Sequence, residues 1–257
     1  MIKMIAVALP TLFISLSGCA KDYSLAPPVD SELITVTVKV PKELVAETMQ
    51  VMYRSTLCTF TDHTASGQPF MRDGYQRTDI QPERQGQSEF YFAKLPMDGG
   101  GACKWRLSNV TFGVTYGNPT RFGENVTSGG GGGVVVVFDQ NNSPRGGTGI
   151  EVDGDLTIKK DYYPWLSEAF LGGYKKHISL AGEGSIYLGY QALQARWVYF
   201  EPVLHSDFLV SSEGTKVHKI GSFIKFTYPD GSVAADGRAK PDFRKLQALR
   251  LAAENKQ

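Results

Sequence analysis

The sequence predicts a mainly β protein with antiparallel β-sandwich architecture, one short internal helix and one helix at the C-terminus. Three observations support this fold class. Short apolar or alternating runs recur along the 257 residues, 28 glycines and 13 prolines are spread along the chain, and only two segments have a helical pattern. Many short strands separated by turn residues are typical of β-sandwiches.

The clearest strand is predicted at residues 33–40. Ile34, Val36 and Val38 alternate with polar residues such as Thr35, which places apolar side chains on one face. This period of two indicates a strand with one buried face. Further strands are predicted at Met49–Ser55, Glu89–Leu95, Lys104–Tyr116, Val134–Phe138, Ile150–Ile158, Ser185–Leu193, Arg196–Val203 and Lys219–Tyr228.

Three polar or glycine-rich segments are predicted to be loops, at Gln76–Ser88, Asn118–Gly133 and Asn141–Gly149. The second ends in five consecutive glycines, which predicts a flexible connection because glycine restricts the backbone least. The third marks a boundary between an N-terminal β lobe at residues 33–140 and a C-terminal β lobe at residues 150–257.

Two helices are predicted. The first covers Pro164–Leu171, because proline is common in a first helical turn and Gly172-Gly173 follows the segment. The second covers Pro241–Asn255, where Phe243, Leu246, Leu249 and Ala253 recur with helical spacing.

Residues 1–18 have the features of a secretory signal peptide. Lys3 precedes an apolar run at Ile5–Leu16, which is too short to remain as a membrane span and ends in small residues. The motif Leu16-Ser17-Gly18-Cys19 resembles the lipobox of bacterial lipoproteins. This resemblance implies cleavage before Cys19 and acylation of that residue.

Acyl chains on Cys19 would anchor the protein stably in a membrane. In bacterial lipoproteins an Asp after the acylated cysteine usually retains the protein in the inner membrane. Ala20 occupies that position, which implies an outer-membrane location on the periplasmic face. Residues 19–32 are polar and contain two prolines, so we expect a tether that reaches about 40 Å when extended.

The chain has three cysteines. If Cys19 carries lipid, Cys58 and Cys103 remain, and in an exported protein they most simply form a disulfide. Closing a loop of roughly 45 residues would stabilise the fold by about 4 kcal/mol in the chain-entropy model. The alternative is a pair of free, buried thiols.

No motif points to catalysis, a metal or a cofactor. The chain lacks a Gly-x-Ser-x-Gly elbow, a His-Glu-x-x-His pair and a phosphate loop. A calcium loop starting at Asp153 fails because its twelfth residue is Pro164 instead of a glutamate. We expect His177 and His205 to be structural. The balance of 27 basic and 26 acidic residues argues against nucleic-acid binding.

Aromatic residues provide the candidate binding site. Tyr162, Tyr163 and Trp165 are predicted to bind a partner, since Tyr and Trp are enriched at protein-binding hot spots. The alternative is that they fill the core, and the same residue types also stack on sugars. The cluster Trp197-Val198-Tyr199-Phe200 is assigned to the core.

The sequence also resembles immunity lipoproteins that neutralise phospholipase effectors of the type VI secretion system. The resemblance lies in the lipobox, in Val51–Ser55 leading to Cys58, and in Cys103-Lys104-Trp105-Arg106-Leu107. It implies a protein without enzymatic activity that binds an incoming secreted phospholipase and blocks its active site. The alternative expectation is a structural or assembly lipoprotein of the cell envelope that binds glycan.

Overall fold

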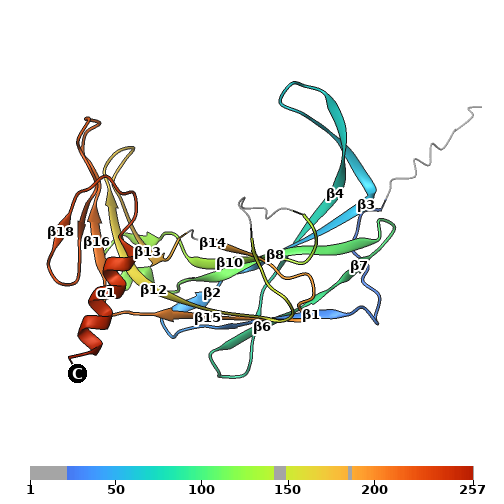
Figure 1. Ribbon diagram of the computed structural model, residues 1–257, viewed down its shortest axis with the longest axis horizontal. Coiled ribbons are helices and arrows are strands. Elements are labelled where there is room, and N and C mark those ends of the chain that lie inside the picture. The colour runs from blue at the N-terminus through green and yellow to red at the C-terminus, as the bar shows by residue number, and fades with distance from the viewer. Residues whose placement is uncertain (1–21, 142–148, 185–186, 257) are drawn as a thin grey trace, which may run out of the picture.

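Two β-sheets form an elongated body in the computed structural model, with a helix at one end and a long hairpin rising from the other (Figure 1). The structure describes residues 22–141, 149–184 and 187–256. The predicted signal peptide, the lipobox with Cys19 and most of the predicted boundary loop lie outside the described residues.

The ten-stranded sheet has the order β18-β17-β16-β12-β15-β1-β6-β5, and β13 and β9 extend it beside β12. Its strands are β1 (Leu33–Lys39), β5 (Glu83–Arg84), β6 (Phe90–Pro96), β9 (Val126–Ser128), β12 (Leu156–Ala169), β13 (Lys175–Gly182), β15 (Trp197–Leu204), β16 (Val210–Glu213), β17 (Lys225–Thr227) and β18 (Val233–Ala234).

The eight-stranded sheet has the order β11-β14-β10-β8-β3-β4, with β2 and β7 also paired to β8. Its strands are β2 (Leu44–Ala46), β3 (Met49–His63), β4 (Pro69–Ile80), β7 (Asp98–Gly100), β8 (Trp105–Tyr116), β10 (Gly132–Val137), β11 (Ile150–Glu151) and β14 (Tyr187–Gln191). A short 3-10 helix, η1, covers Pro119–Phe122.

The prediction of a mainly β fold with two packed sheets is confirmed, but the sheets are mixed and not purely antiparallel. Strand β15 runs parallel to both of its neighbours, β1 and β12. Strand β10 runs parallel to β14 in the other sheet. Apolar alternation shows which face of a strand is buried and carries no information about the direction of its neighbour, so the prediction erred on this point.

The main core joins both halves of the chain. Buried residues of β1 such as Val36 pack in one cluster with Val110 of β8 and with Val198 and Phe200 of β15. Across the two sheets, the rings of Phe112 and Phe200 meet edge to face at 6.0 Å. Residues 33–140 and 150–257 therefore share one core, and the two expected lobes do not correspond to separate cores.

A second, smaller core lies at the end of the body that carries the helix α1 (Phe243–Glu254) (Figure 1). It contains Tyr163, Val210, Phe226 and Leu246. The C-terminal helix was predicted, and its start has a local cause. The side chain of Asp242 accepts hydrogen bonds from the backbone N–H groups of the first helical turn.

The helix predicted at Pro164–Leu171 is wrong, because this segment continues strand β12. Up to Tyr162, β12 pairs with β15, and from Trp165 onward it pairs with β16. Pro164 falls between these two pairings, where its missing N–H removes no bond from the parallel ladders. Gly172-Gly173 follows the strand and belongs to the turn into β13.

The loop predicted at Gln76–Ser88 is also mostly wrong. Strand β4 continues to Ile80, and β5 follows at Glu83–Arg84. The polar composition reflects solvent exposure at the outer edges of the two sheets. Strands β3 and β4 form a hairpin, and its distal part rises away from the body (Figure 1). We call residues 56–73 the arm.

The predicted disulfide between Cys58 and Cys103 is present, with 5.4 Å between the two Cα atoms. Cys58 lies where the β3–β4 register shifts, between Ser55 and Phe60. The Ser55 hydroxyl donates a hydrogen bond of 2.5 Å to the Cys103 carbonyl and accepts one from the Cys58 N–H. The disulfide therefore fixes the base of the arm to the turn that precedes β8.

Residues 22–32 do not form the predicted tether. The Ala26 N–H donates to the Gly99 carbonyl at 2.9 Å, and the Trp105 indole N–H donates to the Tyr23 carbonyl at 3.0 Å. A side chain on Gly100, where φ is +57°, would overlap the Ala26 carbonyl. The glycines thus let the N-terminal segment lie directly on the body, which the composition of that segment did not reveal.

The prediction that the run of five glycines forms a flexible connection is wrong for the last two glycines of the run. Gly132 and Gly133 belong to the buried strand β10. The Tyr162 ring lies where a side chain of Gly132 would be, and a Cβ on Gly182 would come within 2.7 Å of the same ring. Glycine is needed here for close packing against aromatic rings.

Replacing Gly132 by Ala is expected to destabilise the fold by about 1–3 kcal/mol, the usual cost of overpacking a core. Denaturant unfolding measures this change. Gly172→Ala is the control. A Cβ at Gly172 would meet no atom within 4 Å, so this substitution only places an alanine in the left-handed backbone conformation. Its cost is expected to be about 1 kcal/mol. Equal stability of wild type and Gly132→Ala would contradict the packing argument.

Candidate functional site

Of the three residues predicted to bind a partner on the surface, two are buried in the cores. Tyr162 and Tyr163 are only 1% and 0% exposed. Because β12 lies inside its sheet, successive side chains are covered from opposite sides: Tyr162 belongs to the main core and Tyr163 to the second core. Neither ring can contact a partner without rearrangement, so the prediction is wrong for both.

Trp165 is half-buried. Its indole N–H donates to the Ser212 hydroxyl at 2.8 Å. Together with Tyr162, Lys240 and Pro241 it lines a small cavity of about 100 Å³. Trp165 therefore contributes mainly to packing at the helical end of the body.

A different aromatic surface lies on the outer face of the ten-stranded sheet. The register places Thr37 of β1 opposite Phe92 of β6 on one side and Tyr199 of β15 on the other. Tyr199 in turn lies opposite Thr157 of β12. Directly opposite residues point to the same side of a sheet, so these four side chains form a row across four strands.

This surface contains a shallow hollow of about 480 Å³. Trp197, at the start of β15, is the most prominent side chain there and is 56% exposed. We name the surface the Trp197 face, and its residues are Thr37, Gln85, Phe90, Asp155, Leu156, Thr157, Trp197 and Tyr199.

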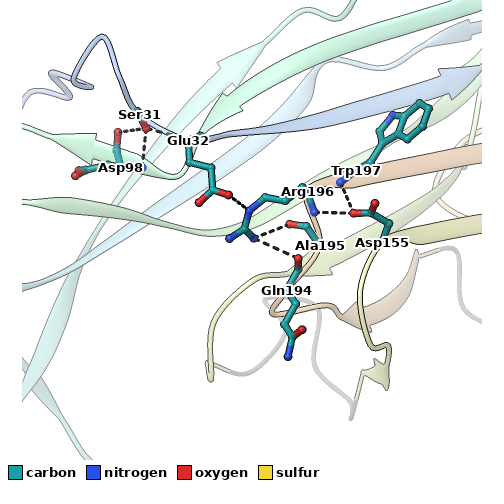
Figure 2. Close-up of polar contacts among 8 residues, drawn as sticks. All are labelled: Ser31, Glu32, Asp98, Asp155, Gln194, Ala195, Arg196 and Trp197. Atoms are coloured by element: carbon teal, nitrogen blue, oxygen red, sulfur yellow. Dashed lines mark hydrogen bonds and ion pairs between the residues drawn. The ribbon is translucent and has the colours of Figure 1, made fainter.

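The backbone at Trp197 is held by a carboxylate from the neighbouring strand connection (Figure 2). Asp155 accepts hydrogen bonds from the backbone N–H groups of Arg196 and Trp197, both at 2.8 Å. These two bonds lower the pKa of Asp155 from its ordinary value of 3.8. The indole N–H of Trp197 also reaches the Thr37 hydroxyl, at 3.4 Å. Trp197 is thus positioned from both neighbouring strands.

Arg196 fixes the turn that leads into β15, as Figure 2 shows. Its guanidinium pairs with Glu32 and donates to the carbonyl groups of Gln194 and Ala195. Next to Glu32, the Ser31 hydroxyl accepts a hydrogen bond from the Asp98 N–H at 3.1 Å. The N-terminal segment and the Trp197 face are therefore connected through one polar network.

An ion pair lies at another border of the Trp197 face. Lys39 Nζ lies 3.0 Å from Glu201 Oε1, and this contact raises the pKa of Lys39. Burial, with a smaller contribution from Glu201, raises the pKa of Tyr199. Tyr199 therefore stays protonated at neutral pH, and its hydroxyl keeps its ability to donate a hydrogen bond.

The Trp197 face is composed mainly of aromatic, aliphatic and hydroxyl side chains. Its residues include no His, Cys or Lys, and Asp155 is its one carboxylate. The histidines singled out in the sequence lie elsewhere: His205 pairs with Asp161 at 2.8 Å, and His177 contacts the Thr127 hydroxyl at 2.8 Å. In the described part of the chain, no group of three or more His, Cys, Asp or Glu side chains could hold a metal ion.

Sequence reasoning missed this face because it assigned the whole cluster at residues 197–200 to the core. The alternation contained the necessary signal. Val198 and Phe200 are buried, whereas Trp197 and Tyr199 point outward from the same strand. Reading the cluster with period two would have separated the two pairs.

The chain matches no known protein family, no curated protein and no solved structure. Within the described residues, no helix has the length and apolar character needed to cross a bilayer.

Replacing Asp155 by Ala is expected to speed hydrogen exchange of the Arg196 and Trp197 amides severalfold, because both lose their acceptor. The lowered pKa of Asp155 adds a pH dependence: protection is complete well above pH 3.8 and is lost as the pH falls through the folded-state pKa. Asp153→Asn, in the same turn, is the control. Unchanged exchange in Asp155→Ala would show that this carboxylate does not hold the turn.

Proposed function

We propose that this chain is an outer-membrane-anchored periplasmic immunity protein that binds and inhibits a phospholipase effector of the type VI secretion system. It acts by binding and has no enzymatic activity of its own. The observation that carries the proposal is the exposed, well-positioned Trp197 on a face that also presents Thr, Phe, Tyr, Gln and Asp side chains. The lipobox at Leu16–Cys19 supports the proposed location in the outer membrane.

The geometry of the Trp197 face supports a protein partner. Trp and Tyr dominate interface hot spots because they bury large areas with few rotatable bonds. Tyr199 and Phe90 line the same hollow as Trp197, and Asp155 holds the Trp197 backbone, so little loop ordering is required on binding. The Lys39–Glu201 ion pair supplies polar side chains at one border of the face.

The docked N-terminal segment supports a role close to the membrane. Only two residues separate Cys19 from Asp22, the first described residue, and the chain from Tyr23 onward lies on the body. An acyl anchor at Cys19 would therefore hold the body next to the bilayer. A phospholipase must reach that bilayer, so an inhibitor anchored there meets it at its substrate.

The same face favours a second candidate, a glycan-binding lipoprotein of the cell envelope. An exposed tryptophan beside hydrogen-bonding side chains, here Asp155, Gln85 and Thr157, also suits a sugar ring. A binding experiment with isolated peptidoglycan distinguishes the two candidate functions. Trp197-dependent binding to peptidoglycan, with no effector recovered from envelope extracts, would favour the glycan-binding function.

Trp197→Ala is expected to weaken effector binding by more than about 2 kcal/mol, or roughly thirtyfold in Kd, because it removes the central side chain of the face. Calorimetry with the effector captured from envelope extract measures the change. Tyr174→Ala is the matched control, since Tyr174 is 59% exposed and lies outside the Trp197 face.

The biological test of the same proposal is competition between sister cells. A strain lacking this protein should be killed by cells that carry the secretion system, and wild-type protein should restore survival. The Trp197→Ala protein should restore it only in part. Full survival of the deletion strain would reject the immunity function.

Cys19→Ser is expected to release the protein from the outer-membrane fraction, since the acylated thiol is lost. Fractionation followed by mass spectrometry of the N-terminal peptide measures the outcome. Substitution of the neighbouring Ser17 by Ala, which keeps a small residue in the motif, should leave the protein anchored. A Cys19→Ser protein that is still cleaved and still fractionates with the outer membrane would contradict the lipid anchor.

A further inference from the structure

Among the described strands, none pairs with the outer edge of β4, which leaves a long edge of its sheet open. It is the outermost strand beside β3 and has twelve residues. The outermost strands elsewhere in the described chain are two or three residues long: β2, β5, β7, β9, β11 and β18. Proteins usually keep exposed edges short, because unpaired backbone N–H and C=O groups recruit other strands. Strand β4 departs from this pattern.

The same strand carries large apolar side chains in solvent. Phe70, Met71 and Tyr75 are 43%, 62% and 57% exposed. The Tyr75 ring meets the ring of Phe60, a residue of the arm, edge to face at 5.6 Å, and this contact holds the Tyr75 ring in place. An ordered edge with exposed apolar side chains has the character of an interface.

The charges on β4 make the edge complementary to itself. When two copies of a strand pair antiparallel about a two-fold axis perpendicular to the sheet, each side chain stays on its own face of the sheet. Directly opposite residues share a face, so the axis must lie midway between the two copies of one residue. With the axis at Tyr75, Asp73 of each copy lies opposite Arg77 of the other. Phe70 then lies opposite Ile80, and the two Tyr75 residues face each other.

Neighbouring registers are worse. An axis at Asp73 or Arg77 places like charges directly opposite each other, which destabilises a sheet. An axis at Gln76 brings Asp73 opposite Asp79, and an axis at Gly74 places Tyr75 opposite Asp73. An axis at Thr78 also places Arg77 opposite Asp79, but it pairs only residues 76–80 of β4. Charge complementarity together with the length of strand paired therefore selects the register centred on Tyr75, which pairs residues 70–80.

We propose that the protein forms a homodimer in which β4 strands of two copies pair antiparallel, with the two-fold axis at Tyr75. The Arg77 guanidinium is already oriented by two hydrogen bonds to Asp79, at 2.8 and 2.9 Å. It lies at the edge where Asp73 of the second copy would arrive. The inference is independent of the proposed function, because β4 belongs to the other sheet from the Trp197 face.

Engineered cysteines test the register in the full chain carrying Cys19→Ser, which removes the lipid anchor and the third thiol. Directly opposite residues of an antiparallel pair have Cα atoms about 4.5–5.5 Å apart, within the range of a disulfide. Tyr75→Cys should therefore give a covalent dimer under mild oxidation. Arg77→Cys is the matched control, since its two copies would lie about 13 Å apart at four residues' offset.

Two further arms complete the experiment. Arg77→Cys mixed with Asp73→Cys should form the covalent heterodimer that neither chain forms alone. In sedimentation equilibrium, Asp73→Arg should weaken dimerisation by about tenfold, from two like-charged pairs, and Asp73→Arg combined with Arg77→Asp should restore it. Circular dichroism confirms that each variant is folded.

The proposal is overturned if the Cys19→Ser chain sediments as a monomer at all concentrations. It is equally overturned if Tyr75→Cys and Arg77→Cys cross-link to the same extent, because that result indicates random collision. A monomer whose β4 edge becomes protected from hydrogen exchange only in envelope extract would assign the edge to a foreign strand.

Discussion

The parallel pairing of β15 between β1 and β12 is the constraint on which the rest of the structure depends. It brings residues far apart in the sequence into one sheet and closes the main core, where Phe200 of β15 meets Phe112 of the other sheet. The same strand presents Trp197 and Tyr199 on the opposite side. The core and the Trp197 face are thus two sides of one strand, and a change in its register would disrupt both.

Close backbone approach is the second organising feature. Glycines let the Tyr162 ring lie between β10 and β13, and they let the N-terminal segment pack beside β7. Through Glu32 and Arg196, that segment also fixes the turn that positions Trp197. The N-terminal segment and the Trp197 face are therefore joined by the Glu32–Arg196 ion pair.

The two surfaces proposed for interaction lie on different sheets. The Trp197 face belongs to the ten-stranded sheet, and the β4 edge belongs to the eight-stranded sheet. A dimer formed through β4 would leave both Trp197 faces open. Two anchored copies would then present two binding faces, and the resulting avidity would compensate for the weak electrostatic steering expected of a chain with little net charge.

Features that depend on local geometry could be predicted from the amino-acid pattern. Alternation at residues 33–40 located β1, the helical spacing that begins at Phe243 located α1, and the cysteine count paired Cys58 with Cys103. The direction of neighbouring strands and the extended conformation of the segment around Pro164 became clear only from the tertiary structure. The tertiary structure also decided which aromatic residues are exposed: Trp197, and neither Tyr162 nor Tyr163. The physical reason is that side-chain periodicity reports the conformation of one strand, whereas burial depends on which distant strands lie on each side of it.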